Sequence, residues 1–329
     1  MRIIVDAFGG DHAPHEILKG ARLAANKLGV EITLAGDESQ IRACAASCRV
    51  SLAGMDILHA PTVFQMEYEP ASILKEHSDS SMSVGLKALA AGQGDAFVSA
   101  GSTGALLVGG TLLVKRIRGV RRAAIAAVLP GNTVPFLLLD AGANSECTAE
   151  MLENFALLGS VYAQKVLQIA NPRVALANIG TEENKGDPLR QETFRSLKAN
   201  TKINFIGNIE AREIPNGGAD VIVADGFTGN IILKLYEGMG KLMTGKLKKM
   251  FLGNPLGWVA AVFAAGGILK LKRQMDYKEY GGAPLLGLSR PVIKAHGSSD
   301  AKAIFHAIRQ AKQCAKSNLA QVIKENLKA

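Results

Sequence analysis

Short apolar runs alternate along the chain with longer segments in which apolar residues recur every three or four positions. The runs are typical of buried strands, and the longer segments of helices with one apolar face. This alternation predicts an α/β fold in three layers, a mostly parallel sheet with helices on both faces. The predicted strands cover residues 3–5, 32–35, 55–59, 96–98, 123–129, 136–139, 174–177, 203–206, 221–224 and 292–295. The predicted helices cover residues 14–28, 38–46, 81–91, 105–114 and 148–166, with one more near 230 and a last one from 300 to the C-terminus.

The most informative stretch is residues 95–105, where a strand breaks into a Gly/Ser/Thr turn and a helix begins at Ala105. A helix start presents free backbone N–H groups at the positive end of the helix dipole, which suits a phosphate or carboxylate group. The stretch matches neither the P-loop nor the dinucleotide-binding fingerprint. By itself it therefore predicts only an anion site.

Polar loops of the same kind follow several other predicted strands, at residues 6–14, 140–144, 178–187, 207–212, 225–230 and 296–300. Ligands of open parallel sheets bind outside the carboxyl ends of the strands. We therefore expect these loops to converge on one cleft and to bind an anion there. The residues predicted to contact it are Ser99, Gly101, Ser102, Thr103, Gly104, Asn178, Thr181, Thr228, His296, Ser298 and Ser299.

Four loop residues are candidates for catalytic groups, namely Asp11, His12, Lys185 and Asn230. Asp11 and His12 suit acid–base chemistry, although turn capping by Asp and a hydrogen-bonded His would explain them as well. Lys185 would balance an anionic ligand, and a solvated lysine is the alternative. Cys147 is a weaker candidate, as a thiol nucleophile, because no His is obviously paired with it.

The length of 329 residues and the hydrophobic content of 48% suit a well-packed enzyme. We expect a single catalytic α/β unit over residues 1–329, undivided or as two lobes around a cleft. The four cysteines show no metal or redox spacing, and a strand begins at once at the N-terminus. Both features predict a reduced, cytoplasmic protein without a signal peptide, metal or cofactor.

The net charge is +9. An aromatic content of 5%, with no basic stretch interleaved with stacking residues, argues against nucleic acid. An acidic protein or an anionic membrane surface fits better. The basic cluster from Lys115 to Arg122 is either a solvated helix end or a docking patch, and the lysines from Lys241 to Lys249 are a second candidate.

An apolar segment at residues 250–273 is flanked by lysines and an arginine and broken by Pro255 and several glycines. These breaks make a membrane-spanning helix improbable. Two readings remain open, a buried helix pair or dimer interface and a hairpin lying on a bilayer. The residues predicted to contact a membrane are Trp258, Val259, Val262 and Phe263.

Several motifs in order along the chain resemble the bacterial phosphate acyltransferase family. They are Val5-Asp6-Ala7-Phe8-Gly9-Gly10-Asp11-His12-Ala13-Pro14, Ser99-Ala100-Gly101-Ser102-Thr103-Gly104-Ala105, Asp140-Ala141-Gly142-Ala143-Asn144, Asn178-Ile179-Gly180-Thr181-Glu182 and Tyr280-Gly281-Gly282-Ala283-Pro284-Leu285-Leu286-Gly287. The resemblance implies transfer of a long-chain acyl group from acyl carrier protein to inorganic phosphate, which gives acyl phosphate for phospholipid synthesis. The predicted anion site would then hold phosphate, which needs no strong protein base to attack a thioester.

The resemblance further implies an isocitrate/isopropylmalate-dehydrogenase-like fold, a homodimer and peripheral association with the inner face of the cell membrane. The partners would be acyl carrier protein and a membrane-bound glycerol-3-phosphate acyltransferase. The nearest rival is a phosphotransacetylase-type enzyme that uses acyl-CoA. A nicotinamide-dependent dehydrogenase and a non-catalytic membrane-surface scaffold are more distant alternatives.

Overall fold

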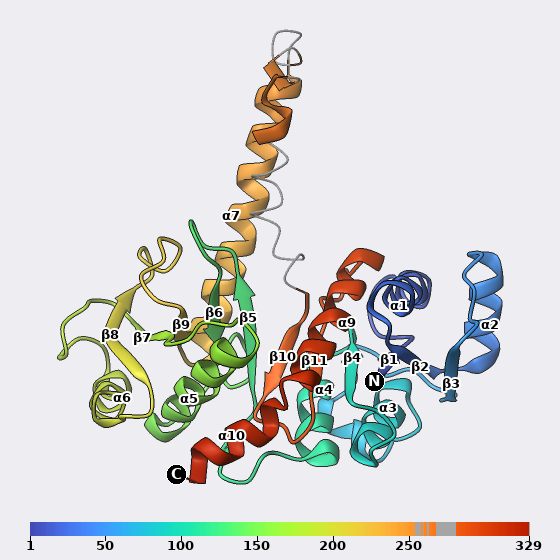
Figure 1. Ribbon diagram of the computed structural model, residues 1–329, viewed down its shortest axis with the longest axis horizontal. Coiled ribbons are helices and arrows are strands. Elements are labelled where there is room, and N and C mark those ends of the chain that lie inside the picture. The colour runs from blue at the N-terminus through green and yellow to red at the C-terminus, as the bar shows by residue number, and fades with distance from the viewer. Residues whose placement is uncertain (254–257, 259, 262, 268–280, 329) are drawn as a thin grey trace.

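The computed structural model describes residues 1–253, 258, 260–261, 263–267 and 281–328. Its described strands form one 11-stranded sheet in the order β3-β2-β1-β4-β11-β10-β5-β6-β9-β7-β8, with helices on both faces (Figure 1). The strands are β1 (Arg2–Asp6), β2 (Glu31–Gly36), β3 (Met55–His59), β4 (Ala96–Ser99), β5 (Ala124–Leu129), β6 (Phe136–Leu139), β7 (Arg173–Asn178), β8 (Asn204–Glu210), β9 (Val221–Val223), β10 (Ala283–Leu286) and β11 (Val292–Lys294). The predicted α/β fold with a mostly parallel sheet is confirmed.

Two apolar cores lie on opposite faces of this sheet. One core is covered by α1 (His15–Leu28), α2 (Glu38–Ser47), α5 (Ala149–Lys165), α6 (Pro188–Ala199), α9 (Ala301–Lys316) and α10 (Leu319–Lys328). The other is covered by the 3₁₀ helix η1 (Pro70–Leu74), α3 (Ser81–Ala90), α4 (Thr103–Gly109), the π-helical turn η2 (Gly110–Val114) and the first turns of α7 (Gly226–Leu252). The central strands β5, β6 and β9 are continuous apolar runs because both of their faces are buried.

The two halves of the sheet run in opposite directions. From β3 to β11 all neighbours are parallel, and so are β6, β9, β7 and β8. Three antiparallel pairings separate these halves, β11 with β10, β10 with β5, and β5 with β6. Measured along the strand direction, the carboxyl ends of one parallel half therefore lie level with the amino ends of the other half.

Several elements differ from the sequence prediction, and helix α6 and the 3₁₀ helix η1 were not among the predicted helices. β8 continues to Glu210 through residues predicted as a loop, because a bulge at Gly207, with φ +104°, lets the strand keep its pairing with β7. The short strand β10 was not predicted, since its Pro284 weakens the strand signal. The predicted last helix is two helices, which separate at Asn318, a residue with φ +48°.

Helix α7 crosses the sheet face and then projects well beyond the rest of the molecule (Figure 1). Ile232, Leu233 and Tyr236 pack against the core, and the Tyr236 hydroxyl group donates a hydrogen bond to the carbonyl oxygen of Pro130 in the β5–β6 turn. No helix in the described part of the chain is both long and apolar enough to cross a bilayer.

Candidate functional site

Three strand-end loops meet at the carboxyl ends of β1, β4 and β11, and we call residues 9–12, 99–104 and 294–299 the first loop group. The backbone N–H of Asp11 donates to the carbonyl oxygen of Gly297 at 2.9 Å. A Cβ atom at Gly9 would lie 2.7 Å from the backbone nitrogen of Gly101, and one at Gly10 would lie 2.9 Å from the Gly297 oxygen. Gly10 also has φ +104°, which other residues rarely adopt. Only glycine therefore lets these backbones pack so closely.

The Asp6 carboxylate, at the end of β1, lies beneath the first loop group and joins β1 to β4 and α3. Asp6 is 1% exposed, and its carboxylate accepts hydrogen bonds from the hydroxyl groups of Ser99, at 2.6 Å, and Ser81, at 2.7 Å. The Phe8 N–H donates to the same carboxylate at 3.2 Å, and the Gly101 N–H donates to the Ser99 hydroxyl at 3.0 Å. Burial raises the pKa of Asp6, although these hydrogen bonds act in the opposite direction.

Lys294 ends β11 directly beside Ser99, its partner in the parallel pairing with β4. Its amino group donates to the carbonyl oxygen of Ala100, at 3.3 Å, and to that of Ala295. Burial lowers the pKa of Lys294 to about 8, and Asp11 and Asp6 partly offset that decrease. Lys234 of α7 lowers the same pKa, so α7 passes near this loop group.

The remaining predicted residues of the first loop group differ in accessibility. Ser102 is the N-cap of α4 and accepts from the Ala105 N–H at 3.4 Å, whereas Thr103 is exposed. A Cβ atom at Gly104 would lie 2.7 Å from Pro70, which places η1 against the start of α4. His12 is exposed.

The His296 ring shares a hydrogen bond of 3.0 Å with the Ser298 hydroxyl group, while Ser299 is buried. Ser99 is also buried and bonded to Asp6. Ser99 and Ser299 are thus placed to support the loops from within, whereas His296 and Thr103 lie at the surface.

A second loop group lies at the carboxyl ends of β6, β7 and β9 and consists of residues 140–144, 178–187 and 225–230. At its centre the buried carboxylate of Asp140 accepts from the N–H groups of Ile125, Gly142, Ala143 and Asn144 at 2.7–3.2 Å. A Cβ atom at Gly229 would lie 1.8 Å from the Asp140 carbonyl oxygen, so the first turn of α7 rests on this loop.

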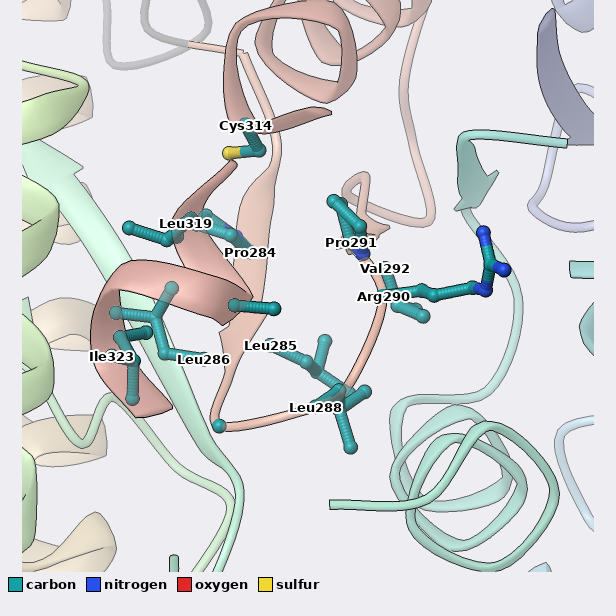
Figure 2. A pocket seen from close by; sticks show the side chains of 12 residues that line it. Pro284, Leu285, Leu286, Leu288, Arg290, Pro291, Val292, Cys314, Leu319 and Ile323 are labelled. Atoms are coloured by element: carbon teal, nitrogen blue, oxygen red, sulfur yellow. The ribbon is translucent and has the colours of Figure 1, made fainter. Parts of the chain in front are cut away.

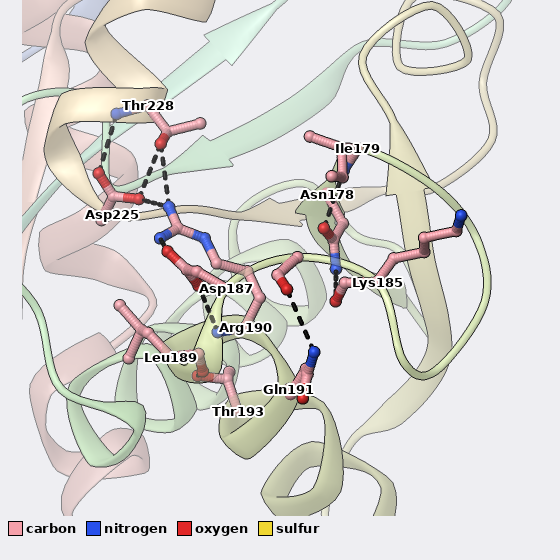
Figure 3. A network of polar contacts seen from close by, with 11 residues as sticks. Asn178, Ile179, Lys185, Asp187, Leu189, Arg190, Gln191, Thr193, Asp225 and Thr228 are labelled. Carbon is pink, nitrogen blue, oxygen red and sulfur yellow. Dashed lines mark hydrogen bonds and ion pairs between the residues drawn. The ribbon is translucent and has the colours of Figure 1, made fainter.

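Arg190 joins α6 to the start of α7 in this second group (Figure 3). Its side chain is 17% exposed, and the guanidinium group pairs with Asp187, at 2.8 Å, and with Asp225. It also donates to the Thr228 hydroxyl group at 3.0 Å. Thr228, predicted to bind an anion, is therefore engaged with Arg190 and with Asp225, the N-cap of α7.

The other predicted residues of the second group lie around this network. The Asn178 side chain bonds the Ile179 N–H and the Lys185 carbonyl oxygen, and so closes its own loop. The Lys185 side chain points away from Arg190 (Figure 3), and its amino group lies 4.0 Å from Glu182. Thr181 and Asn230 are exposed, and Asn230 lies against Gly142.

We expected all the polar loops to converge on one cleft, and this prediction is wrong because of the strand directions. The antiparallel pairings of β10, β5 and β6 reverse the second half of the sheet, so the hydrogen bonds gather the loops into two groups. Helix α7 connects them, because it begins in the second group and brings Lys234 near Lys294. At a rise of 1.5 Å per residue, the nine steps from Asp225 to Lys234 span about 14 Å.

An apolar pocket lies between the β10–β11 turn and α10 (Figure 2). Its lining includes Leu285, Leu288, Val292, Cys314 and Ile323. Because this turn precedes β11, the pocket lies at the opposite end of that strand from Lys294. It is therefore separate from the first loop group.

Two further predictions concern Cys147 and the membrane segment. Burial raises the pKa of Cys147 to about 11, which keeps the thiol protonated near neutral pH and makes it a poor nucleophile. Trp258 and Phe263 are 62% and 88% exposed. Val259 and Val262 lie outside the described residues.

The sequence prediction missed several residues that lie in or beside these groups, among them Asp6, Lys294 and Arg190. Asp6 and Lys294 both end apolar strands, and a charged residue in that position is usually read as solvated. Arg190 lies on a polar helix without a distinguishing motif. Only the pairing of β1, β4 and β11 shows that Asp6 and Lys294 belong to one site.

The fold is similar to that of solved phosphotransacetylases. It is similar to that of the EutD phosphotransacetylase from Staphylococcus aureus, with a TM-score of 0.63 and 16% identity over 96% of this chain and 94% of that one. A phosphotransacetylase from Streptococcus pyogenes gives a TM-score of 0.64 at 16% identity, with the same coverage of both chains. At this identity the likeness concerns the fold alone.

The sequence comparisons define the family. Residues 1–322 match the family described as "Fatty acid synthesis protein". A phosphate acyltransferase from Thermoanaerobacter pseudethanolicus is 44% identical over 100% of this chain and 98% of its own length. Another from Geobacillus thermodenitrificans is 45% identical over 99% of each. The chain belongs to this family of phosphate acyltransferases and is an acyltransferase, which confirms the resemblance seen in the motifs.

Proposed function

We propose that the protein transfers a long-chain acyl group from acyl carrier protein to inorganic phosphate and so supplies acyl phosphate for phospholipid synthesis. The observation that carries this proposal is the first loop group, in which three glycine-containing loops pack around hydroxyl groups and the Lys294 amine. Such a site can hold a phosphate against a thioester and stabilise the developing oxyanion.

In the proposed reaction a phosphate oxygen forms a bond to the thioester carbonyl carbon, and the carbonyl electron pair moves to its oxygen. The tetrahedral intermediate then collapses, the C–S bond breaks and the thiolate of the carrier leaves. A thiol has a pKa of about 8.5, so this leaving group needs little help from a general acid. Asp11, His12, Lys185 and Asn230 remain proposed catalytic groups, and Asp11 and His12 lie in the first loop group.

Direct attack by phosphate, without an acyl-enzyme, is supported by the raised pKa of Cys147. Cys147→Ala should therefore keep its activity, and mass spectrometry should find no acyl group on the wild-type thiol after mixing with the donor. An acylated Cys147, or an inactive and folded Cys147→Ala variant, would contradict direct attack.

The donor is tested by phosphate-dependent thiol release with palmitoyl-acyl carrier protein and with palmitoyl-CoA and acetyl-CoA. We expect efficient turnover only with the carrier protein. Preference for acetyl-CoA would favour a phosphotransacetylase-type activity, which the shared fold makes the leading alternative. Binding to liposomes without any saturable phosphate dependence would instead indicate a scaffold.

The acidic carrier protein would dock on basic residues around the site. Arg118, in the cluster from Lys115 to Arg122, and Lys246, on the projecting part of α7, are both exposed. If either cluster is the docking site, Arg118→Glu or Lys246→Glu should raise the KM for the acyl carrier protein and leave that for phosphate unchanged. An unchanged KM in both variants would exclude both clusters.

We also propose that the protein acts as a homodimer on the inner face of the membrane and passes acyl phosphate to a membrane-bound glycerol-3-phosphate acyltransferase. The exposed Trp258 and Phe263, together with the projection of α7, support contact with a bilayer (Figure 1). Trp258→Glu with Phe263→Glu should abolish flotation with anionic liposomes. If flotation is unchanged while sedimentation shows loss of the dimer, the segment is a subunit interface.

A further inference from the structure

Lys294 is a cation in the first loop group that forms no salt bridge with any described residue. Its amino group bonds only the carbonyl oxygens of Ala100 and Ala295 among the described residues. Two carbonyl groups leave one of the three ammonium donors unused. By contrast, Arg190 of the second group is already paired with two carboxylates, and Lys185 lies next to Glu182.

The surroundings of this amine suit a small oxyanion. Lys294 lies in register with Ser99, so its side chain leaves the sheet where the Gly9–Gly10 and Gly101–Ser102 turns pack together. Two carboxylates raise the pKa of the Lys294 amine, Asp11 first and then Asp6, but neither forms a salt bridge with it among the described residues. The Asp6 carboxylate is occupied by Ser81, Ser99 and the Phe8 N–H. The Asp6 carboxylate thus already accepts three hydrogen bonds from within the protein, whereas the Lys294 amine keeps one N–H donor unused.

We propose that Lys294 binds the phosphate that attacks the thioester, and that the loops at Gly9–Gly10 and Gly101–Ser102 form the walls around it. This inference rests on the proposed function only in taking phosphate as the acyl acceptor. The ammonium group would contact a phosphate oxygen that does not attack, orient the ion and offset its charge. Its depressed pKa of about 8 fits a site that gains a hydrogen-bonded anion on binding.

Binding is tested directly on the wild-type protein, without any acyl donor. Lysines are acetylated with a water-soluble N-hydroxysuccinimide ester at pH 8, in inorganic phosphate or in sodium chloride of equal ionic strength, and labelling of each lysine is followed by mass spectrometry. Phosphate should slow labelling of Lys294 and leave Lys312 unchanged. Lys312 is a matched control because it is also partly buried and donates to a carbonyl oxygen, that of Leu28. Equal labelling of Lys294 in both salts would overturn the proposal.

Kinetics of Lys294→Met and Lys312→Met then test the role in turnover. Loss of a charge-assisted hydrogen bond should raise the KM for phosphate about tenfold or more in Lys294→Met, with the KM for the acyl donor within about twofold. Lys312→Met should behave like the wild type. An unchanged phosphate KM in a folded Lys294→Met variant would overturn the proposal, and Lys294→Gln provides a second variant if the first does not fold.

The two proposals fail separately. Protection of Lys294 by phosphate, in a protein that does not turn over acyl carrier protein, would support the phosphate site and refute the proposed donor. Turnover of acyl carrier protein without protection would support the donor and refute the role of Lys294.

Discussion

The Ser99 hydroxyl group donates a 2.6 Å hydrogen bond to the carboxylate of Asp6, which joins the ends of two neighbouring parallel strands beneath the first loop group. Asp6 also accepts from Ser81 of α3 on the other side. A single buried carboxylate thereby fixes the distance between the glycine turns that follow β1 and β4. Stability and phosphate binding should consequently depend on the same residue.

Asp6→Ala should lower the free energy of unfolding by about 3 kcal/mol, because two buried hydroxyl groups and one N–H lose their acceptor. It should also raise the KM for phosphate. The control Ser81→Ala removes a single donor and should lower stability by about 1 kcal/mol. Urea unfolding measures both values, and equal losses in the two variants would contradict a central role for Asp6.

The pH dependence of phosphate binding should follow Lys294. Its amine is positively charged below about pH 8 and becomes neutral above that value, so the KM for phosphate should rise between pH 8 and pH 9. Burial lowers this pKa most; among charged groups, Asp11 and Asp6 beside β1 raise it and Lys234 on α7 lowers it. Lys294→Arg, which stays charged, should remove the rise. A rise of the same size in that variant would assign it to another group.

The lowered pKa of Lys294 predicts that stability increases with pH over the range in which phosphate binding weakens. An unfolded lysine has a pKa of about 10.4, so between pH 8 and pH 10 the unfolded chain binds more protons than the folded one. The contribution of Lys294 to the free energy of unfolding should therefore increase with pH in that interval. Thermal unfolding of the wild type and of Lys294→Met should show a difference whose size changes with pH.

Ser102→Ala and Thr103→Ala should raise the KM for phosphate by about threefold to tenfold, more than they change that for the acyl donor, since each removes a neutral hydroxyl donor at the first loop group. Ser102 is also the N-cap of α4, so its variant should lose about 1 kcal/mol of stability. Thr103 is exposed and serves as the variant without that loss. A larger effect on the acyl donor would place phosphate at another loop.

Arg190→Gln should destabilise the protein by about 3 kcal/mol, because it leaves the buried carboxylate of Asp225 without its partner at the start of α7. Lys198→Gln is the matched control, since it breaks an exposed ion pair with Glu183 and should change stability by less than about 0.5 kcal/mol. Similar losses in the two variants would show that Arg190 does not anchor α7.

Gly229→Ala should destabilise the protein by about 3 kcal/mol, because the added Cβ would lie 1.8 Å from the carbonyl oxygen of Asp140. Gly238 lies in the same helix, with nothing within 4 Å of an added Cβ. Gly238→Ala should therefore stabilise α7 by about 0.5–1 kcal/mol. Urea unfolding of both variants separates the effect of packing from that of helix propensity.

The amino-acid sequence by itself determined most of the strand and helix order, the polar loops at strand ends and the family, because apolar periodicity and turn residues act over a few neighbouring positions. Only the tertiary structure decided which loops meet. The antiparallel β10, β5 and β6 reverse half of the sheet, and pairing between distant strands leaves no local signal. For the same reason Lys294 resembled an ordinary charge at a strand end, whereas its register with Ser99 and its hydrogen bond to Ala100 place it in the first loop group.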